Sequence, residues 1–374
     1  MNTPPSAPSA HVLRLLAAAR RRTDAVIVPL LERVGPAPAR VLAYQWGVWG
    51  AQGQPVQGSR TGGGKAVRAA LVFACARATG RPDTDPLVPA GAAAVEMLHT
   101  LSLLHDDVMD GDELRRGRPA AWRVFGSDAV EDAVRALTPH AVGLLFDTLP
   151  EPAAATTATG LPGSPPPRDP ETLRAPARAT AVLGDALVRL AQGQALDLAL
   201  EREPSPGVAA TLRVHADKTG SLFACACALG AAPAAASDLT AFGEHLGIAF
   251  QITDDVLGVW GDPAVTGKPA GADLSARKKS HPVAVALTPD PDRADEDIPR
   301  QLHGLYALPR PWTASERAEA GRLLDRSGAR AVSQAAARGH ARAALTALAR
   351  VCPPHEEAGE DLRALASFVT GRPY

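Results

Sequence analysis

Two aspartate clusters stand at the ends of apolar stretches, and they limit strongly how this chain can fold. The first is Asp106, Asp107 and Asp110, and the second, far downstream, is the pair Asp254 and Asp255. Neighbouring carboxylates at the end of a buried helix are costly unless a cation binds there. On a helix, Asp106 and Asp110 would project from one face. Such oxygen ligands suit Mg²⁺ shared with a substrate phosphate, so two facing patches would form a diphosphate site.

The segments around these clusters favour helices. Their apolar residues recur at helical spacing, and few alternating runs of β-branched residues compete with them, so we expect little strand. The fold class predicted is therefore all-α. The segments expected to be helical are 11–34, 66–79, 90–108, 184–201, 208–229, 237–258 and 316–350.

Two interruptions divide these helical segments. Residues 35–64 are glycine-rich and contain Trp46 and Trp49, which is typical of an ordered connection. Residues 150–176 are rich in Pro, Ala, Thr and Gly and predict a disordered surface insertion. Because matching chemistry lies on both sides of each interruption, we expect a flexible tail over 1–10 and a single domain over 11–374.

Lysine is rare in this chain, and its placement is informative. An isolated lysine is usually a solvated surface charge. Here every lysine falls in a glycine-rich or aspartate-rich segment, where a compact positive charge and a closely approaching backbone suit phosphate. The five lysines are Lys65, Lys218, Lys268, Lys278 and Lys279.

Composition argues against several other classes of protein. The formal net charge is −1 and the basic residues form no long run, so no nucleic-acid or polybasic membrane footprint is expected. The four cysteines show neither zinc spacing nor a disulfide framework, which indicates a reduced, cytoplasmic compartment. The N-terminus lacks the pattern of a secretory signal, and no transmembrane segment is expected.

Six motifs in order resemble the signatures of the trans-type polyprenyl (isoprenyl diphosphate) synthases. Residues 96–119 are similar to the family's first aspartate-rich motif with its arginine tail, and Gly63-Gly64-Lys65 precedes it. The match covers roughly residues 60–125 and 184–285. The remaining motifs are Gly193-Gln194 with Asp197, Lys218-Thr219-Gly220, Phe250-Gln251 with Asp254-Asp255, and Gly267-Lys268.

This resemblance implies the isoprenoid synthase fold, an antiparallel helical bundle around a deep central cavity. It implies head-to-tail condensation of isopentenyl diphosphate with an allylic diphosphate, namely dimethylallyl, geranyl or farnesyl diphosphate. It also implies about three Mg²⁺ ions per active site and a homodimer. Leu101 and Ser102, about one turn before Asp106, leave space for a growing chain, so geranylgeranyl diphosphate is the expected main product.

The resemblance also assigns the metal ligands. Asp106 and Asp110 would hold two ions with Asp107 in support, and Asp254 would hold the third with Asp255 nearby. Mg²⁺ and basic groups would neutralise the leaving diphosphate, while the hydrocarbon side of the site stays dry.

Further roles follow from the same motifs. Thr219 and Gln251 would offer oxygen dipoles to the developing cation, and Gln194 would bond a metal-bound water. His105 is expected to be structural only. The residues expected to grip the allylic diphosphate are Arg115, Lys218 and Lys268, those expected to hold isopentenyl diphosphate are Lys65, Arg68, His99 and Arg116, and Lys278 is a further substrate-binding candidate.

Three departures from the family pattern stand out. The usual Gly-Gly-Lys-Arg-x-Arg-Pro lacks one arginine and the proline here, with Ala66 and Ala69 in their places. The second aspartate-rich motif ends in Gly258, where a third aspartate is common. Residues 126–183 match poorly, since acidic residues and then the proline-rich segment replace the usual small-residue helix.

Two other functions compete with chain elongation. A terpene cyclase on the same fold would also use an aspartate-rich motif, but it needs no second diphosphate site, so Lys65, Arg68 and Arg116 argue against it. A noncatalytic or shell-associated subunit is the other alternative. Residues 40–68 resemble an actinobacterial branch with members similar to encapsulin cargo enzymes, which would place the protein in a nanocompartment. The short Pro/Ala/Ser-containing tail is explained more simply as a frayed terminus.

Overall fold

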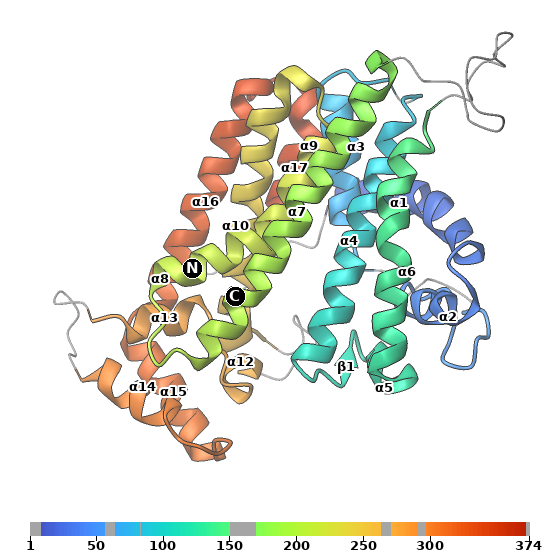
Figure 1. Ribbon diagram of the computed structural model, residues 1–374. Coiled ribbons are helices and arrows are strands. Elements are labelled where there is room, and N and C mark those ends of the chain that lie inside the picture. The colour runs from blue at the N-terminus through green and yellow to red at the C-terminus, as the bar shows by residue number, and fades with distance from the viewer. Residues whose placement is uncertain are drawn as a thin grey trace, which may run out of the picture. The chain divides into compact units, whose positions relative to one another are not determined.

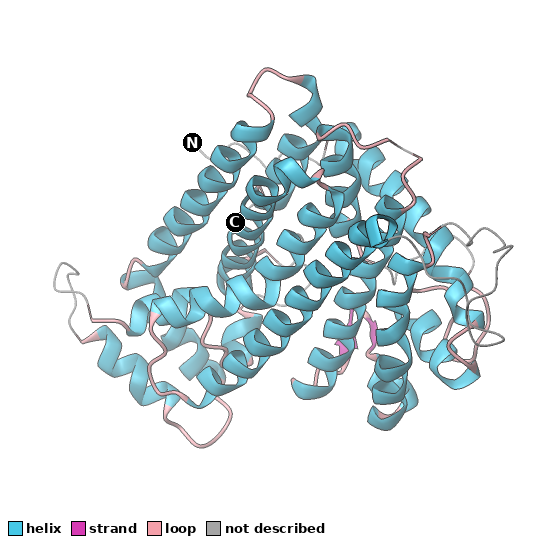
Figure 2. Ribbon diagram, turned by 45° about the horizontal axis from the view of Figure 1, so that its top comes forward, coloured by secondary structure: helices cyan, strands magenta, loops and turns pink. Residues whose placement is uncertain are grey.

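Helices make up nearly all the regular structure of the chain (Figures 1 and 2). The computed structural model describes residues 9–56, 64–82, 84–149, 170–262, 271–289 and 297–371. Within these ranges the strands are two short ones, β1 (Leu114–Arg115) and β2 (Arg118–Pro119), paired antiparallel. The expectation of an all-α fold with little strand is therefore confirmed.

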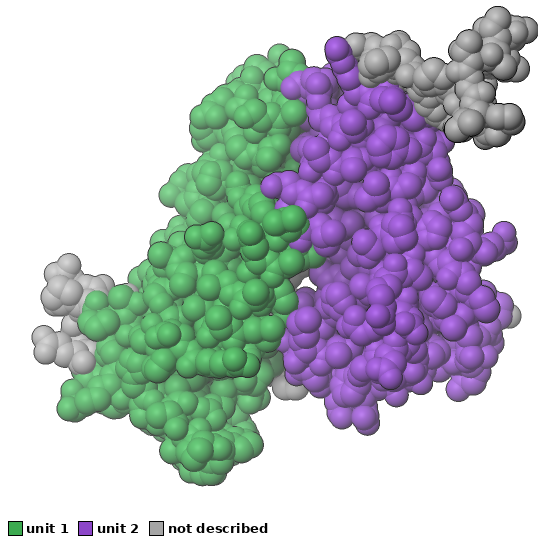
Figure 3. Space-filling view, viewed as in Figure 1, with its two compact units in different colours: residues 1–13, 188–227, 234–374 green, residues 14–187, 228–233 purple. Residues whose placement is uncertain are grey.

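The chain forms two compact units, coloured separately in Figure 3, and each contains several stretches of sequence. Unit 1 comprises Met1–Leu13, Val188–Cys227 and Ala234–Tyr374. Unit 2 comprises Arg14–Leu187 and Ala228–Pro233. Each is described by itself below, and the expectation of a single domain over 11–374 stays a prediction.

Unit 2 is built around α4 (Leu87–Met109), whose side chains are mostly buried. This helix packs against α3 (Val67–Ala78) and α6 (Ser127–Phe146). The unit's other elements are most of α1 (Ala10–Ile27), a 3₁₀ turn at Val28–Glu32, α2 (Pro36–Gln45), the β1–β2 hairpin, α5 (Ala121–Phe125) and the first part of α7 (Pro170–Arg202).

Helix α6 corrects one expectation, because acidic residues do not interrupt the helix after Gly126. Val130, Ala133 and Leu137 are fully buried at helical spacing, whereas Asp128 and Asp132 are exposed on the other face. The segment is thus an ordinary amphipathic helix.

Unit 1 is centred on the pairing of α10 (Ala236–Trp260) with α16 (Ala329–Val351). The predicted helix over 316–350 is broken at Gly328, whose φ of 71° lies in the left-handed region that favours glycine. The unit's other elements are the rest of α7, α8 (Val208–Val214), a π-helical turn at His215–Gly220, most of α9 (Ser221–Gly230), most of a 3₁₀ turn at Pro233–Ala235, α12 (Ala272–Ser275), α13 (His281–Leu287), α14 (Ile298–Tyr306), α15 (Ala314–Arg326), a 3₁₀ turn at Glu357–Gly359 and α17 (Glu360–Thr370).

The insertion predicted over 150–176 is too long at its C-terminal end. Helix α7 begins at Pro170, so residues 170–176 are helical. Proline is tolerated in the first turn of a helix, where its missing N–H would have no partner in any case. Residues 150–169 and 1–8 lie outside the described part of the chain.

Among the described residues, α4 alone is long and apolar enough to cross a membrane, and 67% of its apolar window is buried within the protein. Burial of this kind is typical of a core helix.

Candidate active site

The first aspartate cluster lies at the end of α4, where its members have different environments. Asp107 is 1% exposed and accepts a hydrogen bond from Arg115 Nε at 2.7 Å and a second, shorter bond from the same guanidinium. Asp106 is half-buried and Asp110 is exposed. Asp106 and Asp110, which are four residues apart, thus lie on a different face of the helix end from the buried Asp107, as their spacing predicts.

Arg115 is fixed to this cluster by the hairpin, since it lies in β1. Burial disfavours its charge, but the bond to Asp107 outweighs that effect and raises the pKa of Arg115 above its usual value. Arg115 therefore stays charged and holds Asp107 in place. Its expected grip on the allylic diphosphate stays a prediction.

A cationic cluster forms where the loop before α3 meets α4 and the hairpin. Gly64 has a φ of 67°, in the left-handed region that favours glycine, and a terminal nitrogen of Arg116 lies 2.7 Å from where a Cβ on this residue would be. Glu96 Oε1 accepts the Ala69 N–H at 3.0 Å, which ties α4 to the start of α3. Three of the predicted isopentenyl diphosphate residues, Arg68, His99 and Arg116, meet here, and Lys65 is exposed on the same loop.

The electrostatics of the cluster favour an anion. Burial lowers the pKa of Arg68 to about 10, although Glu96 opposes this, and burial likewise lowers the pKa of Arg116. The pKa of His99 lies well below its ordinary value because of burial and then because of Arg68, Arg116 and Arg115. His99 is therefore neutral at pH 7. A bound anion would relieve the repulsion among these neighbouring cations.

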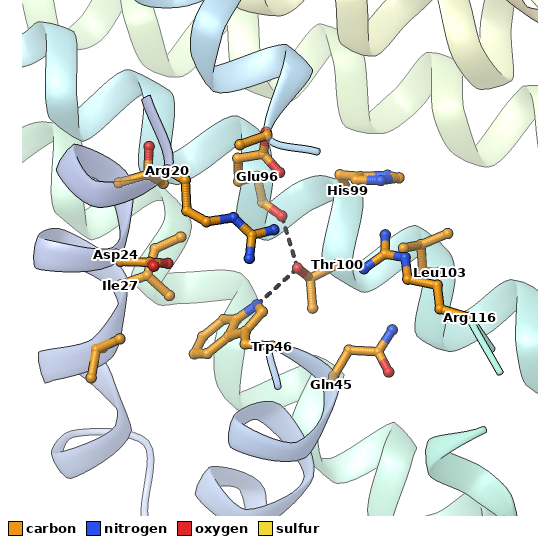
Figure 4. A pocket seen from close by; sticks show the side chains of 13 residues that line it. Arg20, Asp24, Ile27, Gln45, Trp46, Glu96, His99, Thr100, Leu103 and Arg116 are labelled. Carbon is orange, nitrogen blue, oxygen red and sulfur yellow. Dashed lines mark hydrogen bonds between the residues drawn. The ribbon is translucent and has the colours of Figure 1, made fainter. Parts of the chain in front are cut away.

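A small pocket of about 50 Å³ opens beside this cluster within unit 2 (Figure 4). The guanidinium of Arg20 and the side chains of Glu96 and Thr100 surround its centre. Thr100 accepts the Trp46 Nε1–H at 3.0 Å and donates to the Glu96 carbonyl at 2.9 Å. The lining residues are Arg20, Thr23, Asp24, Ile27, Val28, Gln45, Trp46, Ala66, Glu96, His99, Thr100, Leu103 and Arg116.

In unit 1 the π-helical turn presents Lys218 and Thr219. Lys218 Nζ donates to Asp197 Oδ2 of α7 at 2.9 Å, and Thr219 Oγ1 donates to Gln251 Oε1 of α10 at 2.8 Å. Gly193 of α7 permits this arrangement, because a Cβ there would lie 2.7 Å from the backbone nitrogen of Lys218. Lys218, Thr219 and Gln251 are thus brought together, as the motifs predict.

The second aspartate pair repeats the contrast seen in the first. Asp255 is buried and accepts hydrogen bonds from His215 Nε2 at 3.0 Å and the His281 N–H at 2.9 Å, and from Gln251 Nε2 at 3.1 Å. Burial raises the pKa of Asp255, but His215 and these hydrogen bonds outweigh it, so the net pKa lies below the ordinary value. Asp254 is exposed.

Gly258, which stands where a third aspartate is common, has a carboxylate beside it. The Asp273 carboxylate of α12 lies where a Cβ on residue 258 would be. The space beside this last turn of α10 is therefore occupied by a carboxylate from elsewhere in unit 1.

The other predicted residues are more dispersed. Lys278 is exposed on the loop after α12, and Gln194 lies in α7. Lys268 lies outside the described residues. His105 forms a 3.4 Å ion pair with Glu131 of α6, which fits the structural role expected for it. Because the two aspartate clusters belong to different units, their facing arrangement stays a prediction.

Sequence reasoning gave no role to several residues that the structure places in these networks. Glu96 stands within the first motif and His215 three residues before Lys218, but neither residue type signals its partner. His281, whose Nδ1 lies 2.9 Å from Ser333 Oγ, is distant in sequence from Asp255. Only contacts across the fold reveal these roles.

The carboxylates fit Mg²⁺ rather than a cation held by protein alone. In the described part of the chain, no group of three or more His, Cys, Asp or Glu side chains converges to hold a metal. Mg²⁺ binds through one or two carboxylates and takes its other ligands from water and substrate phosphates. Asp106, Asp110 and Asp254 offer oxygen ligands of this kind.

Comparison with known proteins agrees with these features. The polyprenyl synthetase family model matches residues 53–304. A geranylgeranyl diphosphate synthase of Mycobacterium tuberculosis is 38% identical over 96% of this chain and 93% of its own length. A (2E,6E)-farnesyl diphosphate synthase of the same species is 33% identical over 97% of this chain and 94% of its own.

Solved structures extend this likeness to the fold. A polyprenyl synthetase from Streptomyces coelicolor A3(2) superposes with a TM-score of 0.81 at 34% identity, covering 96% of this chain and 99% of that one. A geranylgeranyl pyrophosphate synthetase from Pyrococcus horikoshii superposes with a TM-score of 0.76 at 27% identity, covering 97% and 99%.

The all-α fold, the carboxylates at helix ends and the cationic cluster beside α4 define a class of enzymes that act on diphosphates. The chain belongs to the polyprenyl synthetase family and is a prenyl transferase.

Proposed function

We propose that this protein condenses isopentenyl diphosphate head-to-tail with an allylic diphosphate in a Mg²⁺-dependent reaction. The observation that carries the proposal is the difference between two kinds of anion-binding chemistry. Carboxylates at Asp106, Asp110 and Asp254 suit a diphosphate bound through metal, whereas the cluster of Arg68, His99 and Arg116 suits a diphosphate bound directly. Two different diphosphates are what a condensation requires.

Asp106, Asp110 and Asp254 would hold the ions, with Asp107 and Asp255 in support. Bound Mg²⁺ would neutralise the charge on the leaving diphosphate. Arg115, Lys218 and Lys268 would grip that same group, and Gln194 would orient a water. Thr219 and Gln251, joined by their 2.8 Å hydrogen bond, would turn oxygen dipoles toward the cation that forms on the allylic carbon.

Isopentenyl diphosphate would be held by Lys65, Arg68, His99 and Arg116. Because His99 is neutral, it would donate one hydrogen bond to the diphosphate without adding charge. The double bond of isopentenyl diphosphate would then attack the allylic cation, and loss of a proton would complete the condensation. Lys278, exposed after α12, would contact substrate from the loop.

The main product would be geranylgeranyl diphosphate. Ser102, half-buried with its Oγ donating to the His99 carbonyl at 2.9 Å, leaves no aromatic ring to stop the growing chain about one turn before Asp106. The relative that is 38% identical carries the same product in its name.

We extend the proposal to a homodimer in the cytoplasm. Val142 and Phe146 are exposed apolar side chains on α6 and would suit a contact between subunits. Loading into an encapsulin shell stays a separate prediction for the N-terminal tail.

Substitution of the carboxylates assigned to the metal tests the proposal. Asp106→Ala and Asp254→Ala should each lower kcat by roughly a hundredfold or more, since electrostatic contacts to the transition state typically contribute that much. Asp132→Ala removes an exposed carboxylate of α6, which pairs with Arg135 on the surface, and should leave the rate unchanged. Wild-type turnover by both of the first two variants would refute the metal assignment.

A further inference from the structure

The loop that precedes α3 has a cation beside it that comes from another element. Arg20 lies on α1, far from the loop in sequence, yet its guanidinium donates a short hydrogen bond to the Gly64 carbonyl. It lines the same pocket as Ala66, His99 and Arg116 (Figure 4). Ala66 stands where the family pattern has an arginine, so α1 provides a guanidinium next to the position where the loop lacks one.

A second polar group of α1 lines the same pocket. Thr23 follows Arg20 by three residues, so both side chains project from one face of the helix. Thr23 is 4% exposed, and no polar atom of the described residues hydrogen-bonds to its Oγ1. Nδ1 of His99, in the same pocket wall, is buried and likewise lacks a hydrogen-bond partner among the described residues. Buried polar atoms of this kind need a partner from a ligand or a water.

The charges around the pocket leave a positive balance. Among the described residues, the lining contains two guanidinium groups and two carboxylates, and the adjoining loop and first turn of α3 add two further cations. Arg20 acts on both kinds of group: it opposes the burial that raises the pKa of Glu96, and it adds to the burial that lowers the pKa of Arg116. The cations are Arg20, Lys65, Arg68 and Arg116, and the carboxylates are Asp24 and Glu96. An excess of two positive charges suits a diphosphate.

We infer that Arg20, assisted by Thr23, is a further binding residue for the diphosphate of isopentenyl diphosphate, beside the position where the family pattern has an arginine and this chain has Ala66. The inference rests on the proposed function and deepens it. The guanidinium would donate to a phosphate oxygen while it keeps the Gly64 carbonyl as its second partner. Thr23 would donate its hydroxyl to the same group directly or through one water.

Binding of isopentenyl diphosphate alone, with chelator present, tests this role. No allylic partner is present, so no turnover occurs, and removal of metal suppresses binding at the aspartate clusters. Calorimetry should show that Arg20→Ala raises the Kd by roughly ten- to a hundredfold, the loss expected for one charge-assisted bond to phosphate. Thr23→Val, which keeps the side-chain shape, should raise it by roughly three- to tenfold.

Two further variants separate ligand binding from support of the loop. Arg20→Gln keeps a donor for the Gly64 carbonyl but loses the charge, and should still bind at least tenfold more weakly. Arg21→Ala, an exposed neighbour on α1, is the matched control and should bind as the wild type does. A wild-type Kd for Arg20→Gln, in a protein with an unchanged Tm, would overturn the inference.

Lys65→Ala and Arg116→Ala show which assignment is wrong if the Arg20 variants bind isopentenyl diphosphate as the wild type does. If both weaken binding of isopentenyl diphosphate and the Arg20 variants do not, only the role of Arg20 is wrong. If none of them weakens binding, the assignment of this cluster to isopentenyl diphosphate is wrong as well, and the inference falls with it.

Discussion

Within each aspartate cluster, neighbouring carboxylates differ in their surroundings. Asp107 is buried against Arg115 and Asp255 against His215 and the His281 N–H, whereas Asp110 and Asp254 are exposed. The buried carboxylates hold their helix ends in place through these bonds. The exposed ones present their carboxylates to solvent, where a metal ion can reach them.

The residues around Asp255 predict how stability changes with pH. Burial, with smaller contributions from His215 and His340, lowers the pKa of His281 to about 4, although Asp255 opposes them. Unfolded histidine titrates near 6.5, so the unfolded chain binds more protons than the folded one between these values. Stability is therefore fully present above pH 6.5 and is lost as the pH falls toward 4.

For His281 this loss amounts to about 2 kcal/mol between pH 7.5 and pH 5, at ~1.4 kcal/mol per pH unit. Urea unfolding of wild type and His281→Gln at both pH values measures it, and the variant's loss should be smaller by that amount. His303→Gln, on the half-exposed surface of α14, is the control and should keep the wild-type loss. An identical loss in wild type and His281→Gln would show that His281 does not titrate as described.

At the scale of elements, α7 is positioned against the π-helical turn by one glycine. A Cβ on Gly193 would lie 2.7 Å from the Lys218 backbone nitrogen and 2.9 Å from the Asp217 carbonyl carbon. Both are backbone atoms, so the turn must move to make room. The position of Lys218 and Thr219 thus depends on how closely α7 approaches.

Two glycine substitutions in α7 should therefore have opposite effects. Gly193→Ala should destabilise the protein by about 1–3 kcal/mol, as overpacking does, and should lower kcat by displacing Lys218. Gly184→Ala meets nothing within 4 Å and should stabilise the protein by up to about 1 kcal/mol through helix propensity. Thermal unfolding and steady-state rates of both variants provide the comparison, and equal behaviour of the two would contradict the packing described for Gly193.

The sequence predicted the helices whose apolar periodicity is strong, and α3, α4 and α10 lie close to the expected ranges. It missed α2 and α6, because glycine-rich flanks and exposed acidic residues masked a buried face. The break at Gly328 was also missed, since a glycine within a helical pattern does not reveal its φ.

The residues of the candidate site likewise fall into those that the sequence identifies and those that it does not. Motif residues such as His99 and Lys218 could be found because their types and spacing match a family pattern. Arg20, His215 and Asp273 could not, because each acts on a motif residue that is brought close only by folding. The side chains that lie beside positions 66 and 258 are therefore visible only in the structure.

The whole molecule must bind two diphosphate substrates in different ways and join their hydrocarbon parts. Asp106, Asp110 and the cluster of Arg68, His99 and Arg116 belong to unit 2, where they lie at α3, α4 and the β1–β2 hairpin. Lys218, Thr219 and Asp254 belong to unit 1. A cyclase would need only an allylic diphosphate. Consumption of isopentenyl diphosphate therefore distinguishes the two functions.

The most direct measurement is incubation of the purified protein with isopentenyl diphosphate and each allylic primer, with Mg²⁺ or with chelator, followed by separation of products by chain length. We expect geranylgeranyl diphosphate as the main product with Mg²⁺ and no product with chelator. Release of hydrocarbon from an allylic diphosphate, without consumption of isopentenyl diphosphate, would contradict it.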